Sequence, residues 1–194
     1  MQTRLVTPPT LKPLSVAALK THLRIDGADE DEYLAALIDV ATQHVEERAW
    51  RAVLTQTREL ALDGWPAEGV IELPGAPVQS VTSVKYTTAQ GVEQTLDGNV
   101  YVVNTIAEPG FIKLRNGQSW PGDALAETAA IRVQYVCGWD AAEKIPPALI
   151  HAVRIVAGHF YENREDVVVG GGMSMMRLPE GMTALIEPFR LLRF

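Results

Sequence analysis

The chain has 194 residues, of which 47% are hydrophobic and 21% are charged. This composition is typical of a globular protein, and the length suits one ordinary domain or two small ones. The formal net charge is −7, and the lysines and arginines are scattered, whereas non-specific binding to nucleic acid needs clustered positive charge. We therefore expect no direct binding to DNA, although an acidic wall could let DNA pass without adhering, since like charges repel.

Cysteine usage, the first residues and the lengths of the apolar stretches indicate the cellular compartment. Cys137 is the only cysteine, which excludes an intramolecular disulfide and a thiolate metal cluster. It lies in an apolar run, where we expect a buried small hydrophobic residue rather than a reactive thiol. The first residues lack the apolar core of a signal peptide, and no apolar stretch approaches the length of a membrane span. We expect a protein that is made in, and stays in, a cytoplasm-like compartment.

The first part of the chain has helical patterns. Ser15 is a candidate N-cap for a helix over residues 16–23, and Gly27 is a candidate signal for its end. The acidic residues 29–32 favour the start of a second helix, because carboxylates interact well with the positive end of a helix dipole. This helix is predicted to run to about Trp50, because apolar residues recur at helical spacing: Leu34, Leu37, Ile38, Ala41 and Val45.

The middle of the chain has short runs of β-forming residues separated by Gly, Pro, Asn and Asp. Such runs indicate an antiparallel β-domain. The turn residues at 108–110 predict a tight connection between two strands. We predict strands near residues 57–63, 70–73, 81–87, 101–103, 111–114 and 130–136.

The last part of the chain returns to helical patterns. Pro146 and Pro147 suit the first helical positions, and the helix that follows is predicted to bury Leu149, Ala152, Val153, Val156, Ala157 and Phe160. A Gly-rich loop is expected over residues 167–176, and a last helix from Met182 to about Leu192. The predicted fold class is therefore α+β: a helical bundle from residues 1–53 and 144–194, with an antiparallel β-domain inserted over residues 54–143.

The sequence contains no recognisable catalytic or metal-binding motif. His151 and His159 are eight residues apart, which does not place two ligands side by side on a helix. The glycines at 170–172 are not followed by the Lys and Ser or Thr of a phosphate-binding loop, and residues 29–32 lack the pattern of a calcium loop. We predict no catalytic, cofactor-binding or metal-binding residue. A hydrolase whose site is built from scattered Asp, Glu and His is kept as an alternative.

The C-terminal segment combines large apolar side chains with arginine. Flexible Met side chains adapt to irregular partner surfaces, and aromatic residues and Arg are enriched in interface cores. For residues 185–192 two alternatives are open, namely folding back on the core and contact with a partner. The residues predicted to bind a partner are Met173, Met175, Met176, Arg177, Leu178, Phe189, Arg190, Arg193 and Phe194.

The order of motifs along almost the whole chain resembles the phage head–tail connector family, in the longer form with a β-insertion that also occurs in gene transfer agents. The resemblance begins with residues 14–24 and the helix that ends near Glu46-Glu47-Arg48. It continues through residues 54–57, 73–74, 81–84, 91–96, 119–121 and 133–138, and ends with residues 145–147, 159–165 and 188–194.

This resemblance implies a structural subunit without enzymatic activity or cofactor. It implies a ring, with twelve subunits expected, that lies beneath the portal protein in the neck of the virion, extends the DNA channel and provides a docking surface for the tail. The implied partners are the portal, neighbouring subunits, and tail or stopper proteins, with DNA passing through the channel without specific binding and assembly in the host cytoplasm. Another neck or tail-completion protein is the main alternative, while a packaging protein that binds DNA directly is disfavoured by the scattered basic residues.

Overall fold

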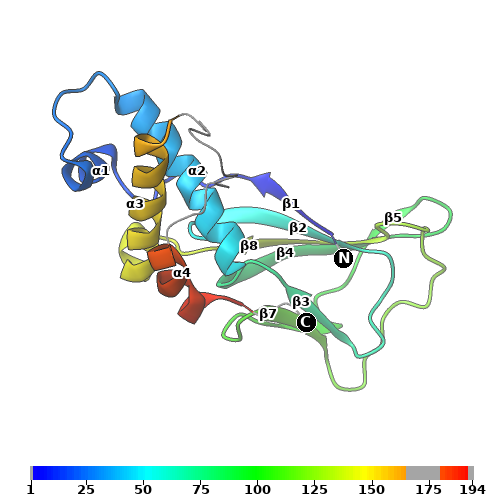
Figure 1. Ribbon diagram of the computed structural model, residues 1–194. Helices are drawn as coiled ribbons and strands as arrows, with labels where there is room; N and C mark the ends of the chain where they lie inside the picture. The colour runs from blue at the N-terminus through cyan, green and yellow to red at the C-terminus, as the bar shows by residue number, and fades with distance from the viewer. Residues whose placement is uncertain (1, 165–179, 192–194) are drawn as a thin grey trace, which may run out of the picture. The chain divides into compact units, whose positions relative to one another are not determined.

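The structure is a computed structural model that describes residues 2–164 and 180–191 (Figure 1). The chain divides into two compact units. We call residues 1–10 and 54–140 the β unit, and residues 11–53 and 141–194 the helical unit. The α+β class is confirmed, because the helices come from both ends of the chain and the strands form antiparallel sheets.

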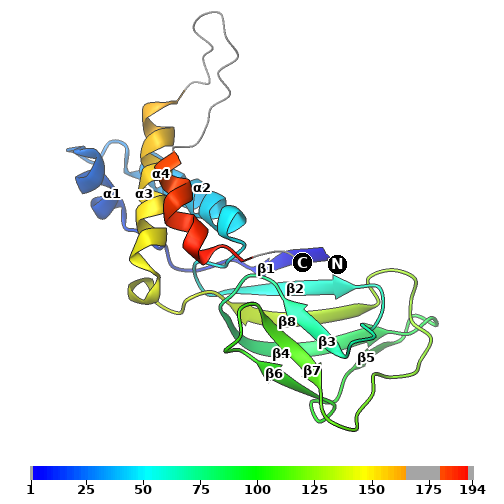
Figure 2. The ribbon, with the colours of Figure 1, turned by 60° about the horizontal axis from the view of Figure 1, so that its bottom comes forward.

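The β unit contains two antiparallel sheets. The larger sheet has five strands in the order β1 (Gln2–Thr7), β2 (Gln56–Leu62), β8 (Ile131–Cys137), β4 (Val78–Thr87) and β5 (Glu93–Thr95). The smaller sheet has the order β3 (Val70–Leu73), β7 (Gly110–Leu114) and β6 (Tyr101–Asn104) (Figure 2). The turn predicted at residues 108–110 connects β6 to β7.

The core of the β unit follows the two-residue period of its strands. Alternate residues of β8 are buried, and the hydroxyl of Tyr135 donates a hydrogen bond of 2.7 Å to the carbonyl oxygen of Pro74. Cys137 is fully buried in the same row, as predicted. Gly138, which follows β8, has a φ of +97°, and a Cβ there would lie 2.1 Å from the carbonyl oxygen of Leu54. Only glycine tolerates both this φ and this approach.

The helical unit contains α1 (Val16–Leu23), α2 (Asp31–Ala49), α3 (Pro147–Glu162), α4 (Glu180–Ile186) and the short 3-10 helices η1 (Ala142–Lys144) and η2 (Glu187–Phe189). The predicted cap of α1 is confirmed, because the side chain of Ser15 accepts a hydrogen bond from the backbone N–H of Ala18. The apolar stripes predicted for α2 and α3 are buried, except that Phe160 is only half-buried. Within the described ranges, no helix is both long and apolar enough to span a membrane.

Two local expectations were wrong, and two strands were missed. Strands β1 and β5 were not predicted. Helix α1 is capped by Arg24, which adopts a left-handed conformation with φ 57° and donates its N–H to the carbonyl of Lys20, so the helix ends before Gly27. The last helix stops at Ile186 and gives way to η2, well before Leu192. Pro188 explains this, because its nitrogen carries no hydrogen to continue the helical ladder.

Candidate partner-binding surfaces

The structure describes two of the residues predicted to bind a partner. Phe189 is half-buried in η2, and Arg190 is exposed, with its guanidinium 3.6 Å from the carboxylate of Glu187. The other predicted residues lie outside the described part of the chain: Met173, Met175, Met176, Arg177, Leu178, Arg193 and Phe194.

The segment around α4 folds back on the helical unit. Met182 and Ile186 are buried, and α4 contacts both α2 and α3. The backbone N–H of Leu191 donates a hydrogen bond of 3.0 Å to the carbonyl oxygen of Ala49, at the end of α2. Of the two alternatives for residues 185–192, folding back is therefore what the described residues show, with the side chain of Arg190 left at the surface.

A polar cluster joins the start of α2 to the end of α3. The guanidinium of Arg164 lies 4.9 Å from the ring centroid of Tyr33 and 4.6 Å from that of Tyr161, within the range of cation–π attraction. Glu30 forms an ion pair with Arg164 and accepts a hydrogen bond from the hydroxyl of Tyr161. We call Glu30, Tyr33, Tyr161 and Arg164 the α2–α3 cluster. These contacts hold Arg164, which is the last residue that the structure describes before position 165.

The hydrogen bonds of the α2–α3 cluster change the acidity of its members. The pKa of Glu30 is lowered from its ordinary value, first by the hydrogen bond from Tyr161 and then by that from Arg164. The pKa of Tyr161 is raised, chiefly because its hydroxyl donates to Glu30. Both effects favour the carboxylate form of Glu30 with a neutral Tyr161, so the cluster is stable as an ion pair at neutral pH. Sequence reasoning read residues 29–32 only as the start of a helix and missed this contact.

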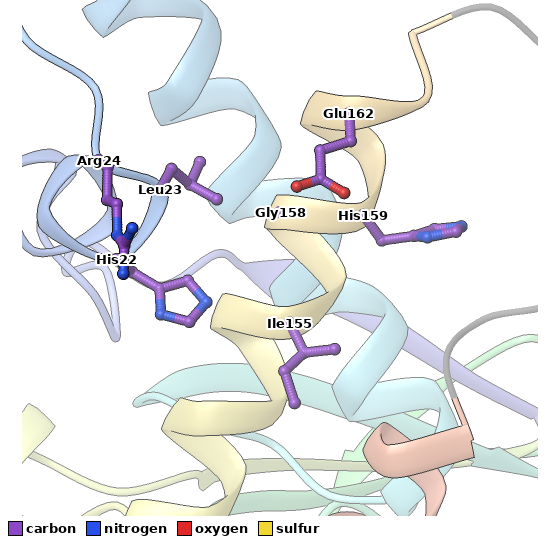
Figure 3. A pocket seen from close by; sticks show the side chains of 7 residues that line it. All are labelled: His22, Leu23, Arg24, Ile155, Gly158, His159 and Glu162. Carbon is purple, nitrogen blue, oxygen red and sulfur yellow. The ribbon is translucent and has the colours of Figure 1, made fainter.

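A shallow groove lies between α1 and α3 (Figure 3). His22 and Arg24 line it from the end of α1, and Gly158, His159 and Glu162 line it from α3. Figure 3 shows that the ring of His159 points away from α1, so that it does not face His22. His22 instead meets His151 edge to face, with the ring centroids 6.0 Å apart. The groove brings no nucleophile up to a base, and the described residues contain no group of three His, Cys, Asp or Glu that could hold a metal ion.

The β unit exposes apolar side chains on two outer strands. All six residues of β1 are exposed, including Leu5 and Val6. Val102 and Val103 of β6 are exposed as well, and Ile106 in the connection to β7 has 92% of its surface open to solvent. Exposed apolar residues that gather on strand edges are typical of interaction surfaces. Sequence reasoning predicted neither surface.

A chain with this α+β fold, with apolar strand edges at its surface, has the features of a protein that works by assembling with other chains. The family model described as "Phage gp6-like head-tail connector protein" matches residues 14–108. Together with the solved structures below, this match confirms the resemblance to the phage head–tail connector family that was drawn from the motifs of the chain. The role of the chain is accordingly that of a structural connector.

Three solved structures that resemble the chain come from gene transfer agent (GTA) particles. A chain of the neck of an empty GTA particle, computed with C6 symmetry, is 27% identical with a TM-score of 0.81. A chain of the virion of the native particle is 26% identical with a TM-score of 0.80, and one of the native neck, computed with C12 symmetry, is 26% identical with a TM-score of 0.79. Each match covers 100% of this chain and 97% of the other. No curated protein matches the sequence at a significant level.

Proposed function

We propose that the chain forms a ring of twelve copies in the neck of a phage-like particle, beneath the portal protein, where it extends the DNA channel and provides a docking surface for the tail. The observation that carries the proposal is the likeness, over the full length of this chain, to a chain of a particle neck computed with C12 symmetry. The subunit acts by assembly and contributes no catalysis. Assembly takes place in the host cytoplasm, and the product is part of the virion neck.

The charge of the chain suits a channel through which DNA moves. A net charge of −7 opposes lasting contact with phosphate. DNA therefore passes through the ring without specific binding.

Residues 165–194 form the contact with the portal or with a neighbouring subunit in this proposal. The support comes from the residues on either side of positions 165–179. Arg164 is held by the α2–α3 cluster, and Met182 and Ile186 are buried in the helical unit. The residues on both sides of positions 165–179 are thus attached to the helical unit. In this proposal the apolar side chains and arginines of residues 165–194 supply the contact with the partner. Arg177, Arg190 and Arg193 are suited to charge-assisted hydrogen bonds with carboxylates of the partner.

The ring is tested by sedimentation of the full chain, alone and mixed with a portal ring. A ring interface can be weak in isolation, because many copies engage together at high effective concentration. We expect a small species alone and a ring-sized complex with the portal. A stable closed dimer without affinity for the portal would contradict the proposal.

The role of residues 165–194 is tested separately by deleting residues 166–176 and, in a second variant, by changing Arg193 and Phe194 to Ala. Each variant should keep the cooperative melt of the parent but fail to join tails to filled heads, as counted by electron microscopy. Changing the exposed Val40 of α2 to Ala is a matched control that removes surface apolar area elsewhere on the helical unit. Normal numbers of tailed particles from both of these variants would show that the interface lies in another part of the chain.

A further inference from the structure

Each sheet of the β unit has two outer strands, and these differ in how well they are protected from pairing with another chain. Natural proteins protect such edges with short strands, charges or proline. Strand β5 has three residues, all polar, and β3 carries Glu72 and is followed by Pro74. Strand β6 has the sequence Tyr-Val-Val-Asn, with no charge and no proline. Strand β1 has one charged residue, Arg4, beside the apolar Leu5 and Val6.

Strand β1 has an edge of the right length for a further strand. It pairs with β2 on one side, and no strand pairs with its other side within the described residues. Residues 2–5 keep a regular register with β2, and the register shifts only between Leu5 and Thr7. Leu5 is 52% exposed, although it pairs with Arg58 of β2, next to the buried Leu60. The regular part of β1 therefore presents both backbone groups and an apolar side chain.

Strand β6 presents a matching edge in the smaller sheet. It has four residues and pairs only with β7 among the described strands. Val103 lies opposite the buried Ile112 and Val102 opposite Lys113, so the two valines point to opposite faces of the sheet. Both are nevertheless exposed, at 36% and 38%. Strand β6 therefore combines an edge that has no strand partner among the described residues with apolar side chains that are open to solvent beside it.

Strand β6 itself carries no charge, but the segments that contain the two edges differ in charge. Residues 2–10 contain Arg4 and no acidic residue, whereas residues 97–109 contain Asp97 and Glu108 and no basic residue. The side chain of Arg4 is 69% exposed even though it pairs with Glu59. Attraction between the segments that contain the edges favours a β1–β6 contact over a contact of either edge with its own copy, because like charges that face each other are unfavourable.

The positions of the two edges suit a ring. In Figure 2, β1 and β6 lie on opposite sides of the β unit, in different sheets. Two different complementary surfaces on opposite sides of a subunit generate head-to-tail contacts, which close into a ring when the rotation fits. We propose that β1 of one copy pairs edge to edge with β6 of the next, so that the β units form the contacts between subunits around the ring. This inference rests on the ring proposed above and names the surface that closes it.

Crosslinking in assembled particles tests the pairing. The full chain would carry Leu5→Cys and Val103→Cys, and a short bis-maleimide would tolerate a register that differs by a residue or two. The native Cys137 is fully buried and does not compete. We expect a ladder of covalent species that extends beyond dimers on a denaturing gel. Each single-cysteine variant should stay monomeric, and so should a Leu5→Cys, Val92→Cys control, in which the second thiol replaces an exposed valine outside both edges.

A second variant measures the consequence for assembly. Val102→Lys with Val103→Lys places charge on the edge that has none, which should remove most tailed particles while leaving the melt of the protein unchanged. Val92→Lys is the matched control and should assemble normally. If the double lysine variant fails to fold, the crosslinking result decides alone.

The outcomes separate the two proposals. A ring seen by electron microscopy without a ladder would overturn the β1–β6 contact and leave the ring itself standing. Dimers from a single-cysteine variant would show that copies of one edge meet each other, and would also overturn the head-to-tail pairing. If unsubstituted particles contain no ring of this chain, the proposed function is wrong, and the β1–β6 contact, which depends on it, is wrong as well.

Discussion

The side chain of Arg51 donates a hydrogen bond from Nε to the backbone carbonyl oxygen of Phe189, 138 residues later in the chain. Arg51 follows the end of α2 and is almost fully buried. Two residues beyond Phe189, the N–H of Leu191 donates to the carbonyl of Ala49. The last carbonyls of a helix have no hydrogen-bond partner within the helix. The N–H of Leu191 supplies such a partner to the carbonyl of Ala49 in α2. The two bonds fix the direction in which the C-terminal residues leave the helical unit.

Replacing Arg51 with Ala is expected to lower the free energy of unfolding by about 1–3 kcal/mol, because the partly buried carbonyl oxygen of Phe189 loses its hydrogen-bond donor. Urea denaturation at neutral pH measures this. Arg190→Ala is the matched control, since its ion pair is exposed at 3.6 Å, and such pairs contribute less than about 1 kcal/mol. If Arg190→Ala keeps its stability yet loses tailed particles, Arg190 binds a partner. Equal stability of Arg51→Ala and the parent chain would show that the hydrogen bond between Arg51 and Phe189 does not hold the C-terminal segment.

Elements with local signals were predictable from the sequence. Ser15 caps α1, and Pro147 lies at the start of α3, because capping and ring geometry depend on residues close in sequence. Strand β1 gave no such signal. All of its residues are exposed, so its sequence shows no alternation, and it becomes a strand only through pairing with β2, more than fifty residues later.

The contacts between distant residues could not be predicted. Glu30 and Arg164 are 134 residues apart, and each has an adequate local explanation as a helix-terminal charge. The partner-binding residues were chosen by residue type alone, which favours the apolar, Arg-rich C-terminus. The same criterion overlooks Val102 and Val103, whose exposure depends on which strand lies at the edge of the smaller sheet.

The ion pair of the α2–α3 cluster predicts a dependence of stability on pH. The pKa of Glu30 in the folded protein lies below its ordinary value of 4.5, because Tyr161 and Arg164 donate to the carboxylate. Its contribution is therefore fully present above pH 4.5 and is lost as the pH falls through the folded pKa. Glu30→Gln should be less stable than the parent at pH 7, and the difference should shrink below pH 4.5.

Urea midpoints of the two proteins across this pH range measure the effect. Glu32→Gln is the control, because it removes a carboxylate that makes no hydrogen bond within the described part of the chain. A deficit of Glu30→Gln that stays constant with pH would mean that the charge of Glu30 is not what the cluster uses.

The close approach at Gly138 predicts a large cost for a single methyl group. Gly138→Ala would place Cβ 2.1 Å from the carbonyl oxygen and 2.3 Å from the carbonyl carbon of Leu54, and these backbone atoms cannot yield without moving the chain that leads into β2. We expect a loss of more than about 3 kcal/mol or failure to fold. Gly91→Ala is matched, because its φ is +79° with nothing within 4 Å of the added methyl. It should lose only about 1–2 kcal/mol of stability, which is the cost of a left-handed conformation for alanine. Equal losses of stability in the two variants would contradict the steric explanation.

The single thiol offers a measure of how often the β unit opens. Cys137 is fully buried at the end of β8, and its sulfur donates a weak hydrogen bond of 3.8 Å to the carbonyl oxygen of Gln56. Thiol reagents require an accessible thiolate, so Cys137 should react only when β8 separates from its neighbours, at a rate set by the free energy of that opening. An aromatic disulfide reagent should find almost no thiol in the native protein and one per chain in denaturant. Leu5→Cys supplies an exposed thiol for comparison and should react at once. A native Cys137 that reacts as fast as the thiol at position 5 would contradict the burial of β8 and would restore a reactive-thiol role for this residue.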